Sequence, residues 1–150
     1  LAGWLGARGL LSPARAGLSR TDLRRAVGVS EGLRAMLHAN NGADCNREAL
    51  ARLNQAATHP GIVIQFDADG RPRFEPHERD IDGALALMLA IVARAQLEGD
   101  WPRFKACPGD DCGWAFYDYS RNQASGWCSM AVCGSRSKAR AYRRRNRRSG

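Results

Sequence analysis

Apolar residues recur at helical spacing over three long stretches of the chain. The first begins at Thr21, which is placed to cap a helix, and ends at the turn Asn40-Asn41-Gly42. The second runs from about Asn46 to Ala57, and the third from Glu78 to about Glu98. Their expected apolar faces are Leu23, Ala26, Val27, Leu33 and Leu37; then Ala49, Leu50, Leu53 and Ala56; then Ile81, Leu85, Met88, Leu89, Val92 and Ala95.

The remaining part of the first hundred residues predicts a shorter helix and a small β component. Leu1–Ala7 is typical of the end of a helix that Gly9 closes. Beyond Pro60 the apolar period becomes extended, so Ile62–Phe66 and Arg73–Glu75 are expected to pair as a hairpin. The turn between them would be Asp69-Gly70, which tolerates positive φ. Residues 1–100 are therefore predicted to form one mainly helical α+β domain.

Charge is distributed unevenly along the chain. Residues 1–100 carry 12 arginines and 12 acids, whereas residues 101–150 carry 11 basic residues and 3 acids, so the C-terminal third holds the whole net charge of +8. Such an excess is typical of proteins that meet a polyanion, most often a nucleic acid, with a solubilising tail as the alternative. The longest apolar run, Ala84–Ala93, is too short to span a membrane, and no secretory signal pattern is present. We therefore expect a soluble, cytoplasmic protein.

Four of the five cysteines form a regular array. They make two pairs, each enclosing four residues, with fifteen residues between the pairs. Two equally spaced pairs suit a tetrahedral thiolate site, and a closed shell of four soft ligands favours a structural zinc ion. Two disulfides, an iron–sulfur cluster or a redox-active thiol set are the alternatives. The expected zinc ligands are Cys107, Cys112, Cys128 and Cys133, and Cys45 is interpreted as a spectator.

The insert between the two cysteine pairs is rich in aromatic residues. Gly113–Tyr119 alternates apolar and polar positions with β-favouring side chains and predicts a strand. We expect the aromatic side chains to form a miniature core beside the metal, with stacking on nucleic-acid bases as the alternative. They are Trp114, Phe116, Tyr117 and Tyr119, together with Trp127.

A basic helix is predicted directly after the last cysteine. Eight of the thirteen residues from Arg136 to Arg148 are basic, and neither Pro nor Gly interrupts the segment. Guanidinium groups match phosphate geometry, so these side chains are candidates for nucleic-acid contact. At helical spacing Ala139 and Tyr142 are left to pack against the cysteine module. The face shared by Arg136, Arg140, Arg143 and Arg147 gives, with its neighbours, the candidate contacts Arg136, Lys138, Arg140, Arg143, Arg144 and Arg147.

Residues 103–145 resemble the CGNR-type zinc finger, a C-terminal module of bacterial proteins described as stress-induced transcription regulators. The resemblance rests on the four cysteines and on the runs Phe116–Asn122, Trp127–Met130 and Cys133–Arg136. Ser135 stands where the family name has Asn, and Ser125-Gly126 occupies a place that is usually basic. The upstream region resembles the ABATE domain that precedes this finger, through Leu1–Leu5, Gly9–Leu11 and Asp22–Arg24.

The resemblance implies two domains with different roles. Residues 1–100 correspond to an ABATE-like regulatory domain whose N-terminal strand is missing, in keeping with a first residue that is Leu1 rather than Met. Residues 103–148 correspond to the finger with its basic helix. The implied function is DNA binding by the finger, with a regulatory or ligand-sensing role for the ABATE part. Apart from the resemblance, we expect a transcription regulator associated with the nucleoid, with a homodimer as one possible state and an unknown small-molecule effector.

The same residues are compatible with other functions. A zinc module with an arginine-rich helix suits RNA or a ribosome electrostatically as well as it suits DNA. Oxidation of the thiolates, with loss of zinc, would make the protein a redox-responsive regulator. We expect no enzyme and no catalytic residue, because His38, His59 and His77 are isolated and a closed four-thiolate shell leaves no catalytic water.

Overall fold

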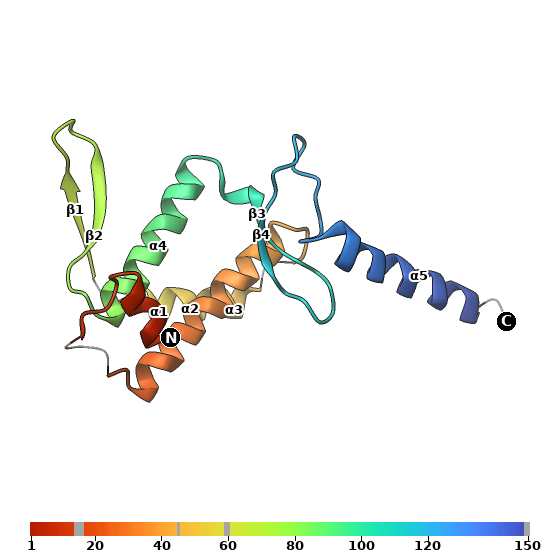
Figure 1. The fold of residues 1–150 in the computed structure, drawn as a ribbon, viewed down its shortest axis with the longest axis horizontal. Coiled ribbons are helices and arrows are strands. Elements are labelled where there is room, and N and C mark those ends of the chain that lie inside the picture. The colour runs from red at the N-terminus through yellow and green to blue at the C-terminus, as the bar shows by residue number, and fades with distance from the viewer. Residues whose placement is uncertain (14–16, 45, 59–60, 149–150) are drawn as a thin grey trace. The chain divides into compact units, whose positions relative to one another are not determined.

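The computed structural model describes residues 1–13, 17–44, 46–58 and 61–148 (Figure 1). Five α-helices, two short antiparallel hairpins, a 3-10 turn at Trp101–Arg103 and a π-helical turn at Met130–Gly134 lie among these residues, which confirms the predicted α+β class with a small four-cysteine module. No helix within the described ranges is long and apolar enough to cross a membrane. The elements are α1 Ala2–Ala7, α2 Arg20–Ala39, α3 Arg47–Ala56, β1 Ile62–Phe66, β2 Pro72–Pro76, α4 Ile81–Leu97, β3 Phe104–Ala106, β4 Ala115–Tyr117 and α5 Ser135–Arg148.

The chain divides into two compact units. One consists of Leu1–Leu33 and Arg47–Gly99, and the other of Arg34–Asn46 and Asp100–Gly150. Helix α2 therefore supplies residues to both, its first part to the N-terminal unit and its last turns to the C-terminal unit. The core of the N-terminal unit consists of Leu5, Leu11, Val29, Leu53, Ile81, Ala84 and Leu85, which are all buried.

The start of α2 is fixed by a residue that the sequence analysis passed over. The Asp22 N–H donates to Ser19 Oγ at 3.1 Å, and the Ser19 N–H donates back to Asp22 Oδ2 at 2.9 Å. This reciprocal pair is a capping box, so the expectation that Thr21 caps the helix is wrong. The Ser19 backbone N–H, followed by the Ser19 hydroxyl, also lowers the pKa of the Asp22 carboxyl.

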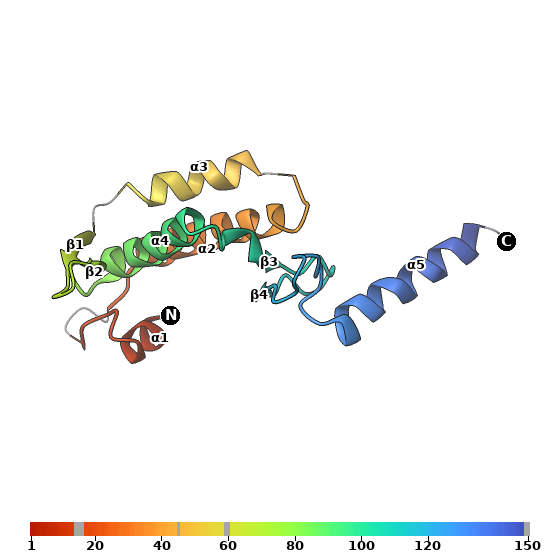
Figure 2. The same ribbon diagram turned by 90° about the horizontal axis from the view of Figure 1, so that it is seen from above.

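The buried face of α2 differs from the expected one. Leu23 and Val27 are about half exposed, whereas Val29 and Gly32 are buried. The reason is that Gly32 lies against α3, where an added Cβ would meet the Leu53 Cβ at 2.6 Å. A residue without a side chain allows the two helices to approach closely and turns the Val29–Gly32 face inward. Figure 2 shows α3 running alongside α2.

Gly32→Ala is expected to destabilise the protein by about 1–3 kcal/mol, because the new methyl group would overpack the contact with Leu53. Gly28→Ala is the matched control in the same helix, since an added Cβ there meets nothing within 4 Å. Its better helix propensity is expected to stabilise the protein by up to about 1 kcal/mol. Urea unfolding of the two variants measures the difference. Equal effects of both would contradict the close approach.

The hairpin and α4 agree with the sequence prediction. Strands β1 and β2 pair in antiparallel register, with Ile64 opposite Phe74, and Gly70 takes a φ of 74° in the turn. Helix α4 begins after Asp80, whose side chain accepts a hydrogen bond from the Gly83 N–H at 3.0 Å. Its first turns bury the expected Ile81 and Leu85. The expected stop at Gly99 is also present, with a φ of 82°.

Candidate metal centre

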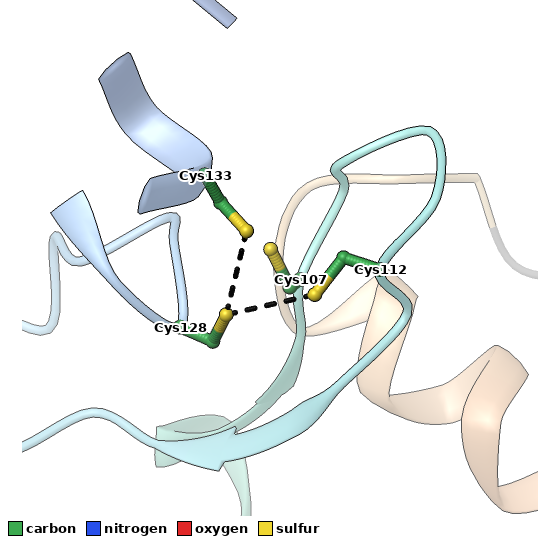
Figure 3. Close-up of side chains that lie close together, drawn as sticks. All are labelled: Cys107, Cys112, Cys128 and Cys133. Atoms are coloured by element: carbon green, nitrogen blue, oxygen red, sulfur yellow. Dashed lines mark hydrogen bonds between the residues drawn. The ribbon is translucent and has the colours of Figure 1, made fainter. Parts of the chain in front are cut away.

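Four cysteine sulfurs converge in the C-terminal unit (Figure 3). All four lie within 4.8 Å of one another, and the Cys128 Sγ lies 3.6 Å from that of Cys112 and 3.7 Å from that of Cys133. A disulfide would require about 2.05 Å, so none of these thiols is bonded to another. Tetrahedral zinc with bonds of about 2.3 Å places its sulfurs roughly 3.8 Å apart, and the observed separations fit that geometry. The cluster is therefore suited to hold one metal ion.

The first cysteine pair is held by a tight loop at the end of the β3–β4 hairpin. The Cys112 N–H donates to the Gly109 carbonyl at 2.9 Å, and the Cys107 N–H donates to the Trp114 carbonyl at 2.9 Å. Gly113 follows with a φ of 59°, which favours glycine. An added Cβ on Gly109 would lie 3.2 Å from the Cys112 Cβ, so a small residue at this position lets the loop close.

The second pair leads directly into the basic helix. Ser129 caps a single π-helical turn, Met130–Gly134, by accepting from the Val132 N–H, and its carbonyl accepts from the Cys133 N–H at 2.9 Å. Helix α5 starts at the next residue, Ser135. The position of the Cys133 sulfur and the start of α5 are therefore fixed by the same turn.

The sulfurs differ in their affinity for protons. Burial would raise the pKa of the Cys107 thiol, but backbone N–H groups of Cys128 and Gly109 donate to its sulfur and lower the pKa to about 7. Burial and the neighbouring sulfurs raise the pKa of Cys128 to about 12, and burial also raises that of Cys133. Once one thiol of such a crowded group is ionised, the others lose their protons less readily unless a cation compensates the charge. This behaviour is typical of a metal-binding site.

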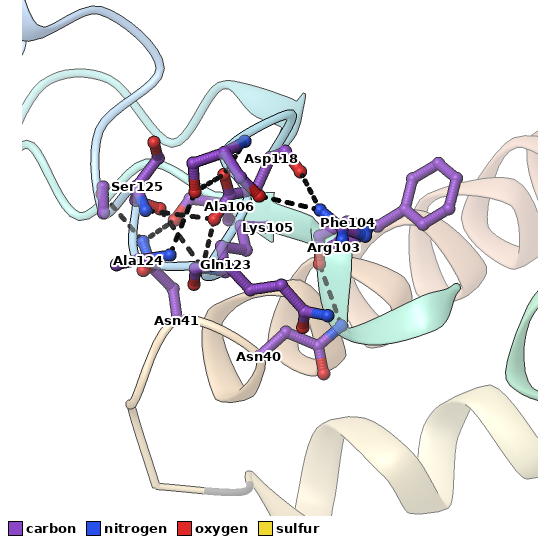
Figure 4. A network of polar contacts seen from close by, with 12 residues as sticks. Asn40, Asn41, Arg103, Phe104, Lys105, Ala106, Asp118, Gln123, Ala124 and Ser125 are labelled. Carbon is purple, nitrogen blue, oxygen red and sulfur yellow. Dashed lines mark hydrogen bonds and ion pairs between the residues drawn. The ribbon is translucent and has the colours of Figure 1, made fainter. Parts of the chain in front are cut away.

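A buried ion pair lies beside the cysteines, and the sequence analysis did not identify it (Figure 4). Lys105 is 5% exposed and Asp118 1% exposed, and the Lys105 Nζ donates to Asp118 Oδ2 at 2.8 Å. The ammonium also donates to the carbonyls of Gln123 and Ser125, at 2.6 and 3.2 Å. The other carboxylate contacts are donated by Ser120 and Ser125. One ion pair thus holds the loop between the cysteine pairs.

Two asparagines at the end of α2 complete the C-terminal unit. The Asn40 Nδ2 donates to the carbonyls of Trp101 and Phe104, both at 2.8 Å. The Asn41 Nδ2 donates to those of Ala106 and Gly126, both at 2.9 Å. From the sequence, Asn40-Asn41 is expected only to end a helix. Consecutive amides at a helix end were the available signal, but their partners lie more than 60 residues away.

Four aromatic residues of the C-terminal unit contact one another. Trp101, Phe104, Tyr117 and Tyr119 form a chain of neighbouring rings, with centroids 4.7 to 5.8 Å apart. Strand β4 confirms the predicted strand, although it is shorter than expected. Trp114 is 69% exposed and Tyr119 88% exposed, so the expectation that these two belong to a miniature core is wrong. Both exposed rings lie just outside the strand, whose own rings, Phe116 and Tyr117, are half-buried.

Helix α5 also departs from expectation in its packing. Tyr142 is 59% exposed and Ala139 is exposed, so these residues do not pack against the cysteine module as predicted. A contact of opposite charge joins the helix to the first cysteine loop instead, because Arg140 pairs with Asp110. Of the candidate contact residues, the structure brings Arg136, Arg140 and Arg144 to one pocket beside the cysteines. Lys138, Arg143 and Arg147 are exposed outside it.

Three residues named in the sequence analysis lie outside the described residues: Cys45, His59 and Pro60. Among the other histidines, His38 is half-buried on α2 and His77 is exposed after β2. In the part of the chain that the structure describes, the four cysteines are the one group of metal-binding side chains that converges.

The fold and the cysteine cluster define a zinc-finger protein in which a helical α+β unit accompanies a metal-binding module. Comparison with protein families is more specific. A model described as "Putative stress-induced transcription regulator" (ABATE) matches residues 1–98, and the CGNR zinc finger matches residues 103–146. The chain therefore belongs to the ABATE family and carries a CGNR zinc finger. Neither is an enzyme family. No curated protein matches the chain.

Proposed function

We propose that the protein is a DNA-binding transcription regulator in which one zinc ion fixes a basic helix for contact with phosphates. Cys107, Cys112, Cys128 and Cys133 would hold the ion. Residues 103–148 would carry the DNA contact, and residues 1–100 would sense a signal or mediate self-association. Regulation is supported by the family description of the N-terminal part, and the zinc site by the matched finger and by the sulfur separations.

Zinc suits this site better than the other ions that thiolates bind. The four ligands are all sulfur, they surround a single point, and a closed shell leaves no position for a reacting water. Cys107 and Cys133 are buried, which is typical of a structural site. The ion would join the two cysteine loops, and its role would be to hold the start of α5.

The observation that carries the DNA proposal is the position of the basic residues. Helix α5 begins two residues after Cys133, and Arg136, Lys138, Arg143 and Arg147 expose their side chains. A rigid helix presents these cations at fixed spacing, so that several phosphates can be contacted without ordering a flexible tail. Phosphate contact alone gives affinity and not sequence preference.

Double substitution of Arg143 and Arg147 by alanine is expected to weaken DNA binding and reduce its salt dependence. Each phosphate contact adds about 0.9 to the slope of log affinity against log salt, so loss of two contacts should lower the slope by roughly 2. Fluorescence anisotropy with a labelled duplex from about 50 to 200 mM salt measures it. Double substitution of Arg52 and Arg73, two exposed arginines of the N-terminal unit, removes the same charge and is the matched control.

Three outcomes bear directly on the proposal. An unchanged slope in the double variant would remove α5 from the interface. Absence of DNA affinity at low salt in the zinc-loaded protein would remove the DNA-binding function altogether. Tighter binding of structured RNA than of duplex DNA in direct competition would replace DNA by RNA as the partner.

A further inference from the structure

A pocket of about 430 Å³ opens between the cysteine cluster and α5. Its walls come from both cysteine loops and from the first half of the helix. The volume lies within the range of ligand sites, about 300–1,000 Å³. A single metal ion is no larger than a water molecule, which occupies about 30 Å³. An ion held among the sulfurs would therefore leave most of the pocket volume open. The residues that matter for its chemistry are Asp110, Trp114, Trp127, Arg136, Arg140 and Arg144.

The pocket places exposed indole surface beside guanidinium groups. Trp114 is 69% exposed and Trp127 is half-buried. Arg136, Arg140 and Arg144 are spaced by four residues along α5, so they lie on one face of the helix. The Asp110 carboxylate pairs with Arg140, and both side chains line the pocket.

These groups match the two halves of a nucleotide. An exposed indole provides a flat apolar surface on which any base can stack, and arginines bind the flanking phosphates. A duplex keeps its bases stacked inside the helix, so it could offer phosphates to α5 but no base face to Trp114. A strand with an unpaired base could offer both.

We propose that this pocket takes one unstacked base of the bound nucleic acid, with Trp114 as the stacking surface and Arg136 and Arg144 on the adjacent phosphates. The preferred substrate is therefore DNA with a locally unpaired strand, and not a uniform duplex. This inference rests on the proposed function, because the phosphate contacts are those of the basic helix. It adds a residue outside that helix to the interface.

The test uses the zinc-loaded full chain and two fluorescein-labelled DNAs of about 20 base pairs that differ only in a central bulge of two unpaired nucleotides. Stacking of one base on an aromatic residue corresponds to about 5- to 150-fold in affinity. The wild-type protein is expected to bind the bulged DNA at least about fivefold more tightly. Trp114→Ala should remove this preference and leave the affinity for the uniform duplex nearly unchanged.

Two further variants keep the result interpretable. Trp4→Ala makes the same change at an exposed tryptophan of the N-terminal unit and should preserve the preference. Trp114→Phe retains an aromatic ring, so it should keep most of the preference while losing the quenching of tryptophan fluorescence that the bulged DNA causes. If Trp114→Ala fails to retain zinc, the loss of quenching in Trp114→Phe tests the contact with the base instead.

The outcomes separate the inference from the proposed function. Equal binding of both DNAs by the wild-type protein, or an unchanged preference in Trp114→Ala, would overturn the inference and leave phosphate contact by α5 intact. Binding of neither DNA at low salt would instead overturn the proposed function, and the inference with it.

Discussion

Replacement of Cys128 by serine is expected to abolish metal binding and to unfold the C-terminal unit. The Cys128 sulfur lies within 3.7 Å of both Cys112 and Cys133, so it links the two cysteine loops. A serine hydroxyl is a poor ligand for an ion that prefers thiolates. Structural zinc contributes about 10–16 kcal/mol in small fingers, and the apolar residues buried in this unit are few, mainly Ala106, Cys107 and Cys133. Little else could compensate for its loss.

Elemental analysis and circular dichroism of the purified variant provide the measurement. The wild-type chain should carry about one zinc ion, and the variant close to none, with loss of helical signal from α5. Cys45→Ser is the control, because Cys45 is predicted to be a spectator. A full zinc content in Cys128→Ser would show that the four-sulfur site is not the metal site.

Removal of the Asp118 carboxylate should have the second largest effect. Asp118→Ala would leave the ammonium of Lys105 buried with only two carbonyl partners. Breaking one side of a buried ion pair typically costs about 3–5 kcal/mol, because the remaining charge is uncompensated. Urea unfolding of the zinc-loaded protein, followed by tryptophan fluorescence, measures the loss. Asp110→Ala, which removes an exposed carboxylate from the same unit, should cost less than about 1 kcal/mol.

The same pair fixes the sign of the pH dependence. Hydrogen bonds from Lys105 and then from Ser120 lower the pKa of Asp118 in the folded protein, so the unfolded chain binds the proton more readily. The stabilisation is therefore complete above the ordinary pKa of 3.8 and is lost as the pH falls below it. From about pH 8 to about pH 5 the Asp118 carboxylate is ionised in both the folded and the unfolded wild-type chain, so its contribution to the free energy of unfolding should not depend on pH there. An NMR titration of the folded wild-type protein in which the Asp118 carboxyl gains a proton above about pH 5 would contradict the assignment.

The sequence predicts local features of this fold well, because their causes are local. Two cysteines separated by four residues can meet on one loop, and the turn at Asp69-Gly70 needs only its own residues. Helix α5 follows from an arginine-rich segment that neither Pro nor Gly interrupts. These features are present in the structure as expected.

The features that the sequence analysis missed depend on distant partners. Lys105 and Asp118 are ordinary charged residues until β3 and β4 place them face to face, and a buried lysine is rare enough that no pattern predicts it. The predicted buried face of α2 is wrong for the same reason. Gly32 has a low helix propensity, and its role is visible only in the contact with Leu53. Apolar periodicity alone favoured Leu23 and Val27.

The amides at the end of α2 have a practical consequence for dividing this chain. A fragment that starts at residue 100 would contain every cysteine ligand and the whole of α5. It would lack Asn40 and Asn41, so four backbone carbonyls would lose the hydrogen bonds that these side chains donate in the intact protein. The zinc-finger motif is therefore one continuous stretch of sequence, but the folded unit that contains it is built from two separate stretches. A transfer of the finger to another protein has to include residues 34–46 as well.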